Sequence, residues 1–450
     1  MTDGNLMTVI LAAGKGTRMK SARPKVLHEI AGLSMLGHVL RATKEAGASS
    51  TVVVVGPDMD NVAEEARRHV PEAGIAVQHR QQGTADAVLA ARQAIASHRG
   101  PVLVLFADTP LLRSSTLTDM HTQLANGANV AVLGFEAADP TGYGRLLTDP
   151  DGGLRAIREH NDASEEERRV RLSNSGVMGF NCPDLLSILD GIGCDNAKGE
   201  YYLTDAVGLA RASGLKATVT LCPEDEVLGV NSREQLASAE SIYQRRRRAA
   251  AMQDGCTMIA PDTVWLSHDT RLGRDVVIEP NVYFGLGVTI EDGVWIRANC
   301  HFEHALIKTG AIVGPFARLR PGAVIGNEVH IGNFVEVKNV ELGHGAKANH
   351  LAYLGDGTVG AGANIGAGTI FCNYDGYFKH RTEIGDKAFI GSNSSLVAPV
   401  KIGNGAYVGS GSVITREVPA DALALERGTQ TDRPGWAAKF RELMLRRKKT

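Results

Sequence analysis

A repeat of six residues governs the C-terminal half of the chain. From residue 272 onward an apolar side chain recurs at almost every sixth position, often followed by glycine, as in IGNEVH, IGNFVE, VGAGAN and IGDKAF. This period matches neither the 3.6 residues of an α-helical turn nor the alternation of a simple strand. It is typical of a parallel β-helix, in which each hexapeptide forms one flat side of a triangular coil and points one apolar side chain inward. The predicted inward residues are Leu272, Ile278, Phe284, Ile290, Ile296, Phe302, Ile307, Val313, Leu319, Ile325, Ile331, Val337, Leu342, Ala348, Leu354, Val359, Ile365, Ile384, Ile390, Leu396, Ile402, Val408 and Ile414.

The composition agrees with this architecture, because glycine is abundant, with 51 residues, and glycine suits the corners of such coils. With three hexapeptides to a coil, the repeat implies about eight coils. The period breaks at FCNYDGYFKHRTE (371–383), which we expect to loop out of the solenoid. Such an excursion from a regular scaffold is a candidate functional element. After about residue 428 the period ends and a basic, helix-compatible tail follows.

The N-terminal half has a different pattern, in which short apolar runs alternate with amphipathic stretches. We predict strands at 8–14, 51–56, 74–78 and 101–108, and helices at 34–47, 59–70 and 85–98. This alternation is typical of βαβ units, so we predict a Rossmann-like α/β domain with a mostly parallel sheet. Ligands of such sheets bind at the carboxyl ends of the strands.

A segment with no glycine or proline, 231–252, separates the two halves and predicts one long connecting helix. We therefore divide the chain into an α/β domain (1–230), a helical linker (231–252) and a β-helix domain with its tail (253–450).

The bulk composition excludes several classes of protein. The formal net charge of −2 gives no overall field for nucleic acid or an anionic membrane. Two local basic runs, RRRR (245–248) and RRKK (446–449), predict a solvated helix face and a solvated tail. No apolar run is long enough to span a membrane, and six scattered cysteines without CxxC spacing favour a reducing compartment. We therefore expect a cytoplasmic protein without a structural zinc site, membrane insertion or nucleic-acid partner.

Directly after the first predicted strand comes LAAGKGTRM (11–19), a glycine-rich loop of the kind that binds phosphate. It is not a Walker A loop, because Val9 stands at the position of the first glycine and Gly16 follows Lys15. It also fails the dinucleotide-binding pattern, whose third glycine is Met19 here.

The longer pattern L-x-x-G-x-G-T-R-M-x4-P-K, from Leu11 to Lys25, resembles the signature of nucleotide-sugar pyrophosphorylases. These enzymes join a nucleoside triphosphate to a sugar 1-phosphate. The resemblance implies that the loop Leu11, Ala12, Ala13 and Gly14 holds UTP. It also implies that Arg18 and Lys25 act as catalytic cations against the charge of the triphosphate.

Further segments resemble the same family in the same order along the chain. The motif Q-x-x-Q-x-G-T implies a uracil site, and Asp108 in FADTPL and Asn231 in GVN imply Mg²⁺ ligands, with Asn231 also at the UDP-sugar site. One carboxylate and one amide oxygen, completed by phosphates and water, is a usual Mg²⁺ environment. The implied uracil residues are Gln78, Gln81, Gly83 and Thr84, and the implied amino-sugar residues are Gly144, Glu159 and Asn174.

The hexapeptide half resembles the left-handed β-helix of hexapeptide acyltransferases. With both halves in one chain, the sequence resembles the bifunctional N-acetylglucosamine-1-phosphate uridyltransferase / glucosamine-1-phosphate acetyltransferase family over essentially its whole length. That resemblance implies acetyl transfer from acetyl-CoA to glucosamine 1-phosphate, uridylyl transfer from UTP to N-acetylglucosamine 1-phosphate, and a homotrimer.

The family's acetyl-transfer residues have counterparts here. His350, in ANHLAYLGD, matches the catalytic base, since a histidine can accept the proton of an amine acceptor near neutral pH. Ser410 stands where relatives often have alanine. The implied acceptor contacts are Arg320, Lys338, Tyr353, Asn364, Asn373 and Tyr374, and the implied coenzyme A contacts are Ala367, Ser392, Ser410 and Arg427.

Two other hypotheses compete with a bifunctional enzyme. The chain could be a monofunctional nucleotide-sugar pyrophosphorylase whose β-helix only assembles or regulates it. It could also be a structural or ligand-binding solenoid without activity, although that hypothesis leaves the grouping of Arg320, Lys338, His350 and Tyr374 unexplained.

Overall fold

The computed structural model describes residues 5–448. It divides into two compact units, whose boundary between Arg247 and Arg248 falls inside helix α9 (Arg233–Gln253). The long connecting helix predicted at 231–252 is therefore present. Each unit is described by itself below.

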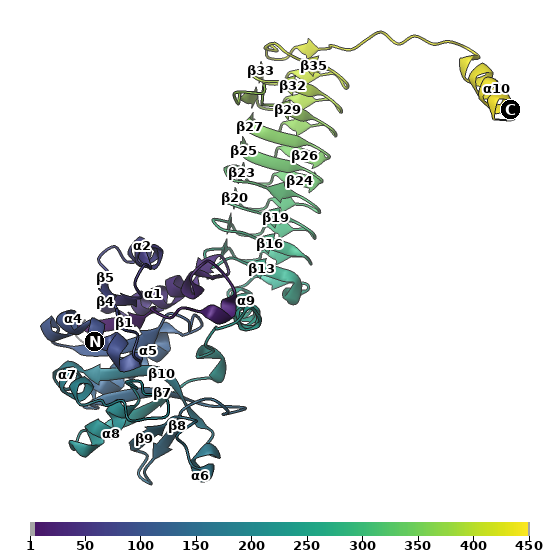
Figure 1. The fold of residues 1–450 in the computed structure, drawn as a ribbon. Coiled ribbons are helices and arrows are strands. Elements are labelled where there is room, and N and C mark those ends of the chain that lie inside the picture. The colour runs from purple at the N-terminus through teal and green to yellow at the C-terminus, as the bar shows by residue number, and fades with distance from the viewer. Residues whose placement is uncertain (1–4, 449–450) are drawn as a thin grey trace. The chain divides into compact units, whose positions relative to one another are not determined.

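A mostly parallel sheet forms the centre of the N-terminal unit (Figure 1). The strand order is β11-β7-β10-β6-β1-β4-β5, and only β10 runs antiparallel to its neighbours along this path. A hairpin of β8 (Arg145–Thr148) and β9 (Leu154–Arg158) attaches beside β10, and β2 (Glu29–Ile30) pairs with β3 (Leu33–Ser34). The main strands are β1 (Leu6–Leu11), β4 (Ala48–Val55), β5 (Gly74–Val77), β6 (Pro101–Phe106), β7 (Val130–Glu136), β10 (Leu172–Asn181) and β11 (Ala217–Leu221).

Helices cover both faces of this sheet, because the side chains of a strand alternate between its two faces. Leu6 and Ile10 of β1 pack with α1 (Met35–Glu45), α2 (Asp60–His69) and α5 (Ser114–Ala125). Met7, Val9 and Leu11 of the same strand belong to the opposite layer. That layer contains α3 (Thr84–Ala90), α4 (Arg92–Ser97), α7 (Cys182–Asp190) and α8 (Asp205–Ala212).

The predicted helix at 85–98 is two helices, α3 and α4, which meet at Ala91. A short helix, α6 (Glu165–Arg168), lies outside both layers and begins with a capping box at Ser164. The other strands and helices predicted for this unit are confirmed, with shifts of up to three residues at their ends.

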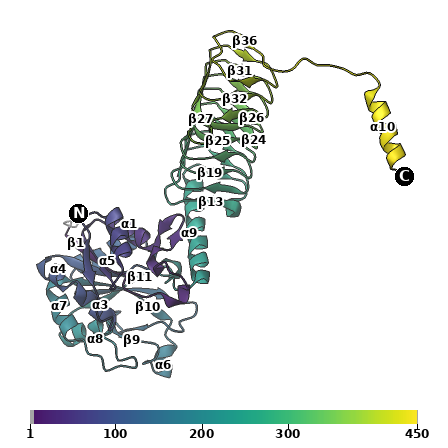
Figure 2. The ribbon, with the colours of Figure 1, turned by 45° about the horizontal axis from the view of Figure 1, so that its top comes forward.

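The C-terminal unit is a parallel β-helix of the left-handed hexapeptide class, with its coils stacked one above the next (Figure 2). One side of the coils is a ten-stranded sheet: β12 (Thr257–Met258), β15 (Val277–Ile278), β18 (Trp295–Ile296), β21 (Ile312–Val313), β24 (His330–Asn333), β26 (Lys347–His350), β28 (Asn364–Ile365), β31 (Phe389–Ile390), β34 (Tyr407–Val408) and β36 (Leu423–Ala424).

The other two sides form a single larger sheet, because β25 (Glu336–Leu342) and β27 (Tyr353–Val359) continue around a corner and pair on both sides. The second side contains β13 (Val264–Leu266), β16 (Val282–Phe284), β19 (His301–Phe302), β22 (Arg318–Leu319), β29 (Ile370–Cys372), β32 (Ser395–Val397) and β35 (Val413–Ile414). The third contains β14 (Arg271–Leu272), β17 (Thr289–Ile290), β20 (Ala305–Ile307), β23 (Ala323–Ile325), β30 (Thr382–Ile384) and β33 (Val400–Ile402).

One continuous hydrophobic core fills the β-helix. Every inward residue predicted from the six-residue period lies in that core, except Leu272, which is partly buried and packs against it. Equivalent positions of successive coils pair in register, as Val277 does with Trp295. The period therefore fixes both the fold and the residues that lie above one another.

The excursion is shorter than the predicted 371–383. Phe371 has 0% of its surface exposed, lies in the core and pairs with Leu396 of the next coil. Thr382 is equally buried and pairs with Val400. The prediction was wrong at both ends, because Phe371 continues the six-residue spacing from Ile365 and Thr382 already belongs to β30, two residues before the inward Ile384.

The prediction of a solvated helix face for RRRR was wrong for Arg246 and Arg248, whereas the side chain of Arg245 is 67% exposed. Arg248 has 7% of its surface exposed and donates to Asp262 at 2.7 Å and to the carbonyl of Val264 at 3.3 Å. Arg246 donates to Asp225 at 2.7 Å and to the carbonyl of Leu111 at 2.8 Å. Composition could not reveal these partners, since they lie on other segments.

The tail is consistent with its prediction as far as it is described. Helix α10 (Trp436–Arg447) has no buried residue, and Lys449, in the second basic run, lies outside the described residues. Within residues 5–448 no helix has the length and apolar character needed to cross a membrane.

The revised limits of the excursion can be tested with two phenylalanines. Phe371→Ala should lower the free energy of unfolding of the β-helix by about 3–5 kcal/mol, because it removes a fully buried ring and leaves a cavity. Phe378→Ala is the matched control, since that ring is 71% exposed on the excursion and its removal should change stability little. Denaturant unfolding followed by circular dichroism measures both, and equal effects would contradict the assignment.

Candidate functional sites

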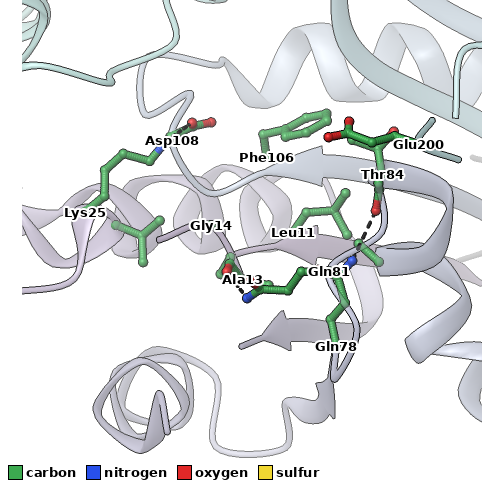
Figure 3. Close-up of a pocket in the computed structure, with 14 residues that line it drawn as sticks. Leu11, Ala13, Gly14, Lys25, Gln78, Gln81, Thr84, Phe106, Asp108 and Glu200 are labelled. Carbon is green, nitrogen blue, oxygen red and sulfur yellow. Dashed lines mark hydrogen bonds and ion pairs between the residues drawn. The ribbon is translucent and has the colours of Figure 1, made fainter. Parts of the chain in front are cut away.

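A cavity of about 270 Å³ opens at the carboxyl ends of β1 and β6 (Figure 3). This edge of a parallel sheet is where ligands are expected. Ten of the lining residues were predicted from the sequence, and four were not. The predicted ones are Leu11, Ala12, Ala13, Gly14, Lys25, Gln78, Gln81, Gly83, Thr84 and Asp108, and the others are Val26, Ala87, Phe106 and Glu200.

The glycine-rich loop forms one wall and is fixed by neighbouring segments. The amide of Ala12 donates to the carbonyl of Val54 at 2.8 Å, and the side-chain amide of Gln81 donates to the carbonyl of Ala13 at 3.0 Å. Gly16 has a φ of 59°, a left-handed conformation that glycine adopts without strain. No other atom lies within 4 Å of the position that a Cβ would take at Gly14, so a ligand can approach the backbone there.

A second wall is the turn that carries Gln78, Gln81, Gly83 and Thr84. The Gln78 amide donates to the Gly83 carbonyl at 3.1 Å, and the Thr84 hydroxyl accepts from the amide of Leu203 at 2.9 Å. Gly83 has a φ of 126°, and a Cβ there would lie 2.5 Å from the Tyr201 carbonyl oxygen. Only glycine fits this close approach, so the turn and the segment around Tyr201 fix each other's position.

Lys25, Asp108 and Asn231 meet at the opposite end of the cavity from Thr84 and Glu200, where Figure 3 shows Lys25 and Asp108 pointing toward each other. The Lys25 ammonium pairs with the Asp108 carboxylate and donates to the side-chain oxygen of Asn231 at 2.8 Å. The amide of Val230 donates to the Asp108 carbonyl at 2.9 Å, which joins the two acceptor segments.

Two oxygens from distant segments therefore converge on one cation, here the lysine ammonium. This donor set fits Mg²⁺, which accepts one or two protein oxygens and completes its shell with phosphates and water. The described residues contain no group of three or more His, Cys, Asp or Glu that could hold a metal alone, so further ligands would come from the substrate and water.

The residues predicted for the amino sugar form a separate group. The amide of Asn174 donates to the Gly144 carbonyl at 2.8 Å, and the Thr204 hydroxyl donates to Glu159 at 3.0 Å. None of Gly144, Glu159 and Asn174 lines the cavity. Glu159 connects to it through Thr204, which follows Leu203, the residue whose amide donates to Thr84. Arg18 is exposed and does not line the cavity either.

In the β-helix, three of the six predicted acceptor residues form a polar network, namely Lys338, Tyr353 and Asn373, and a fourth, Arg320, makes a separate ion pair. Arg320 donates to Glu336 at 2.8 Å, and the Lys338 ammonium lies 3.6 Å from the Asp356 carboxylate. The side-chain amide of Asn373 donates to Asp356 at 2.6 Å. It also donates at 3.5 Å to the hydroxyl of Tyr353, another predicted acceptor residue.

Asp356 is the centre of this network, although sequence reasoning missed it. Burial raises the pKa of its carboxyl, but hydrogen bonds from Asn339 and Asn373 and the charge of Lys338 outweigh burial, so the pKa is lowered. The carboxylate is thus held ionised beside Lys338. In the register of the β-helix Lys338 pairs with Gly355, and Asp356 is the next residue. This position of a carboxylate beside a predicted acceptor residue is the signal that could have found it.

His350 lies at the end of β26, and its Nδ1 is 2.7 Å from the side-chain oxygen of Asn333, its partner one coil earlier. Backbone hydrogen bonds between successive coils stack further residues at the same corner of the β-helix as His350. The amide of Gly368 donates to the His350 carbonyl at 3.3 Å, and the amide of Asn393 donates to the Ala367 carbonyl at 2.7 Å. We call the stack Asn333, His350, Ala367, Ser392 and Ser410 the corner column.

Arg427 extends the corner column, since its guanidinium donates to the Ser410 carbonyl at 3.0 Å. The structure thus brings His350 and every predicted coenzyme A residue to one edge of the β-helix. Asn364 lies on β28, near this edge, and Tyr374 is exposed on the excursion with its hydroxyl bonded to the Gly376 carbonyl at 2.5 Å. Among the described bonds, none joins Asn364 or Tyr374 to His350.

Comparisons with known proteins agree with both halves. The model of the MobA-like NTP transferase domain matches residues 8–172, and that of the bacterial transferase hexapeptide matches residues 381–416. The chain is 61% identical to the bifunctional protein GlmU of Azorhizobium caulinodans over 441 residues, which cover 98% of each chain. It is 55% identical to the bifunctional protein GlmU of a Bradyrhizobium species over 449 residues, which cover 100% of each chain.

The chain belongs to the bifunctional GlmU family. As a member of this family it is a bifunctional enzyme of UDP-N-acetylglucosamine synthesis, with uridyltransferase and glucosamine-1-phosphate acetyltransferase activities. The monofunctional and structural hypotheses are therefore set aside.

The contact between Gly83 and Tyr201 makes a prediction for the GlmU-type uridyltransferase. Gly83→Ala should lower this activity by about ten- to a hundredfold, because the new Cβ would displace a wall of the cavity. Gly208→Ala is the control, since this helical glycine of α8 has nothing within 4 Å of its Cβ position. Steady-state rates of both activities measure the effect. A Gly83→Ala enzyme with unchanged uridyltransferase activity would contradict the close approach.

Proposed function

We propose that the cavity of the N-terminal unit binds UTP and Mg²⁺ and transfers the uridylyl group to N-acetylglucosamine 1-phosphate. The observation that carries this proposal is the convergence of Asp108 and Asn231 on a cation beside a phosphate-type loop. The family activity agrees with it, because a uridyltransferase needs such a centre.

In the proposed step, an oxygen of the sugar phosphate attacks the α-phosphorus of UTP, and the bond to pyrophosphate breaks. No protein base is needed, since the attacking phosphate is already anionic. The backbone from Leu11 to Gly14 binds the triphosphate, and Lys25 and Arg18 neutralise its charge. Mg²⁺, held by Asp108 and Asn231, supplies further charge neutralisation when bound. Gln78 and Gln81 orient the uracil, and Gly144, Glu159 and Asn174 orient the amino sugar.

For acetyl transfer, we propose that His350 is the general base. The amine of glucosamine 1-phosphate attacks the thioester carbonyl of acetyl-CoA, His350 accepts the proton that the amine loses, and the carbon–sulfur bond breaks. The departing thiolate of coenzyme A then takes that proton. Arg320 and Lys338 bind the sugar phosphate, while Ala367, Ser392, Ser410 and Arg427 contact coenzyme A along the corner column. The remaining acceptor contacts are Tyr353, Asn364, Asn373 and Tyr374.

The two steps have a fixed order in this proposal, since the acetylated sugar phosphate is the acceptor for the uridylyl group. We also propose a homotrimer and a cytoplasmic location. The trimer rests on the resemblance of the hexapeptide half to trimeric acyltransferases. The location is supported by the cysteines whose side chains are described, all of which are free.

Substitutions should separate the two activities. His350→Ala should abolish acetyl transfer and spare uridylyl transfer, whereas Asp108→Ala should do the reverse, because each side chain belongs to one centre only. The assay supplies glucosamine 1-phosphate, acetyl-CoA, UTP and Mg²⁺ and measures UDP-N-acetylglucosamine. N-acetylglucosamine 1-phosphate, added instead of the amine, should restore product with the His350 variant alone. A folded variant that lost both activities would refute independent centres.

Asn333 should act as a positioning residue for His350. In the tautomer with its proton on Nδ1, His350 donates to Asn333 and keeps Nε2 as the proton acceptor. Asn333→Ala should lower kcat for acetyl transfer about tenfold with little change in either KM, because the ring loses its orientation but not its binding surface. Asn333→Asp retains the acceptor and should restore most of the rate. A changed KM with an unchanged kcat would contradict this role.

A further inference from the structure

The N-terminal unit contains a second cavity, of about 370 Å³, which shares no lining residue with the first. It is enclosed by helix α1, helix α9 and the segment 110–115, whose last two residues begin α5. It is the larger of these two cavities, and neither the uridyltransferase nor the acetyltransferase proposal uses it. Two arginines of the RRRR run, Arg246 and Arg247, line it. The other lining residues are His38, Arg41, Ala42, Glu45, Pro110, Leu111, Leu112, Arg113, Ser114, Ser115 and Tyr243.

The lining is strongly basic. It contains Arg41, Arg113, Arg246 and Arg247. The only acidic residue of the described lining is Glu45, which accepts from Arg41 at 2.7 Å, so the lining has a formal excess of three positive charges. Solvated arginines are common on protein surfaces, but four in the lining of one cavity are a concentration of charge that favours an anion. The guanidinium group matches phosphate oxygens in geometry and keeps its charge at any physiological pH.

Two of these arginines are held in place from outside the cavity. Arg246 donates to Asp225 at 2.7 Å, and Arg113 lies 3.2 Å from Glu226, whose side chain is only 2% exposed. Neither carboxylate belongs to the lining. Each arginine has five N–H donors, so one carboxylate orients the group without using all of its donors. The Nε of Arg246 is buried without a partner among the described residues, which leaves a donor unmet.

Polar groups complete the cavity. Ser114 and Ser115 line it at the first turn of α5, and this turn contains no acidic residue and no side-chain cap. The backbone and hydroxyl groups there add to the arginines as potential donors to an anion, although they would not define a site alone.

We propose that this arginine cavity binds a small, multiply charged phosphate compound, at a site separate from both catalytic centres. Its volume lies in the range of small-molecule sites. The charge excess selects a compound with several negative charges, such as an oligophosphate or a phosphate ester with more than one phosphoryl group. The proposal does not depend on the assignment of the UTP site.

Inorganic tripolyphosphate is a suitable probe, and hydrogen–deuterium exchange of the full chain localises its binding. At low ionic strength, tripolyphosphate should slow exchange in peptides covering 110–120 and 240–247. It should also protect the glycine-rich loop 11–25, as an independent readout of the proposed nucleotide site. Protection of only one region therefore shows which of the two proposals fails.

Variants of the arginine cavity sharpen this test. Ser115→Asp places a negative charge in the lining while favouring the first turn of α5, so the protein should fold but lose protection at 110–120 and 240–247. Arg41→Gln should weaken binding there about tenfold, the usual effect of losing one charge-assisted hydrogen bond. Arg67→Gln, an exposed arginine of α2 outside the lining, is the control of equal charge and should bind as the unaltered chain does.

The proposal is overturned if the unaltered chain shows no protection at 110–120 when loop 11–25 is protected. It is equally overturned if Ser115→Asp retains full protection there.

Discussion

One inward apolar side chain in each hexapeptide is the constraint on which the β-helix depends. Because each coil repeats this placement, the outward residues of successive coils lie above one another without any long-range loop. His350, Ala367, Ser392 and Ser410 are far apart in sequence, but the register of the core places them on one corner. The core thus builds the proposed acetyl-transfer edge, and each contact on it involves only neighbouring coils.

The N-terminal cavity depends on a different kind of contact. Its walls come from the ends of β1 and β6, the turn around Gly83 and the segment around Tyr201, and each is held by a bond to another. Lys25 joins Asp108 and Asn231, which come from separate parts of the chain. This centre is built from segments far apart in the chain, whereas the corner column is built from adjacent coils.

Much of the fold could be predicted because it is periodic. The six-residue repeat located the core of the β-helix, and the alternation of strands and helices located the sheet and its ligand edge. Phe371 was assigned to the excursion although it continues the six-residue spacing from Ile365; like Leu319 and Val337, it is an inward residue with no glycine after it. The break between α3 and α4 carries no glycine or proline, so no local signal announces it.

The remaining errors concern side chains whose environment is set by distant partners. Glu200, Asn333 and Asp356 belong to the sites because other elements bring them there, and no motif marks them. The RRRR run shows the same limit of prediction from sequence, because here a motif was noticed but its environment was assigned wrongly. Its composition is that of a solvated surface, but Asp225, Asp262 and the Leu111 carbonyl turn two of its arginines into fixed structural groups. A run of charged residues therefore predicts a solvated surface only where no other segment supplies partners for it. Here the partners orient the charge, and oriented charge in a cavity favours the binding of an anion.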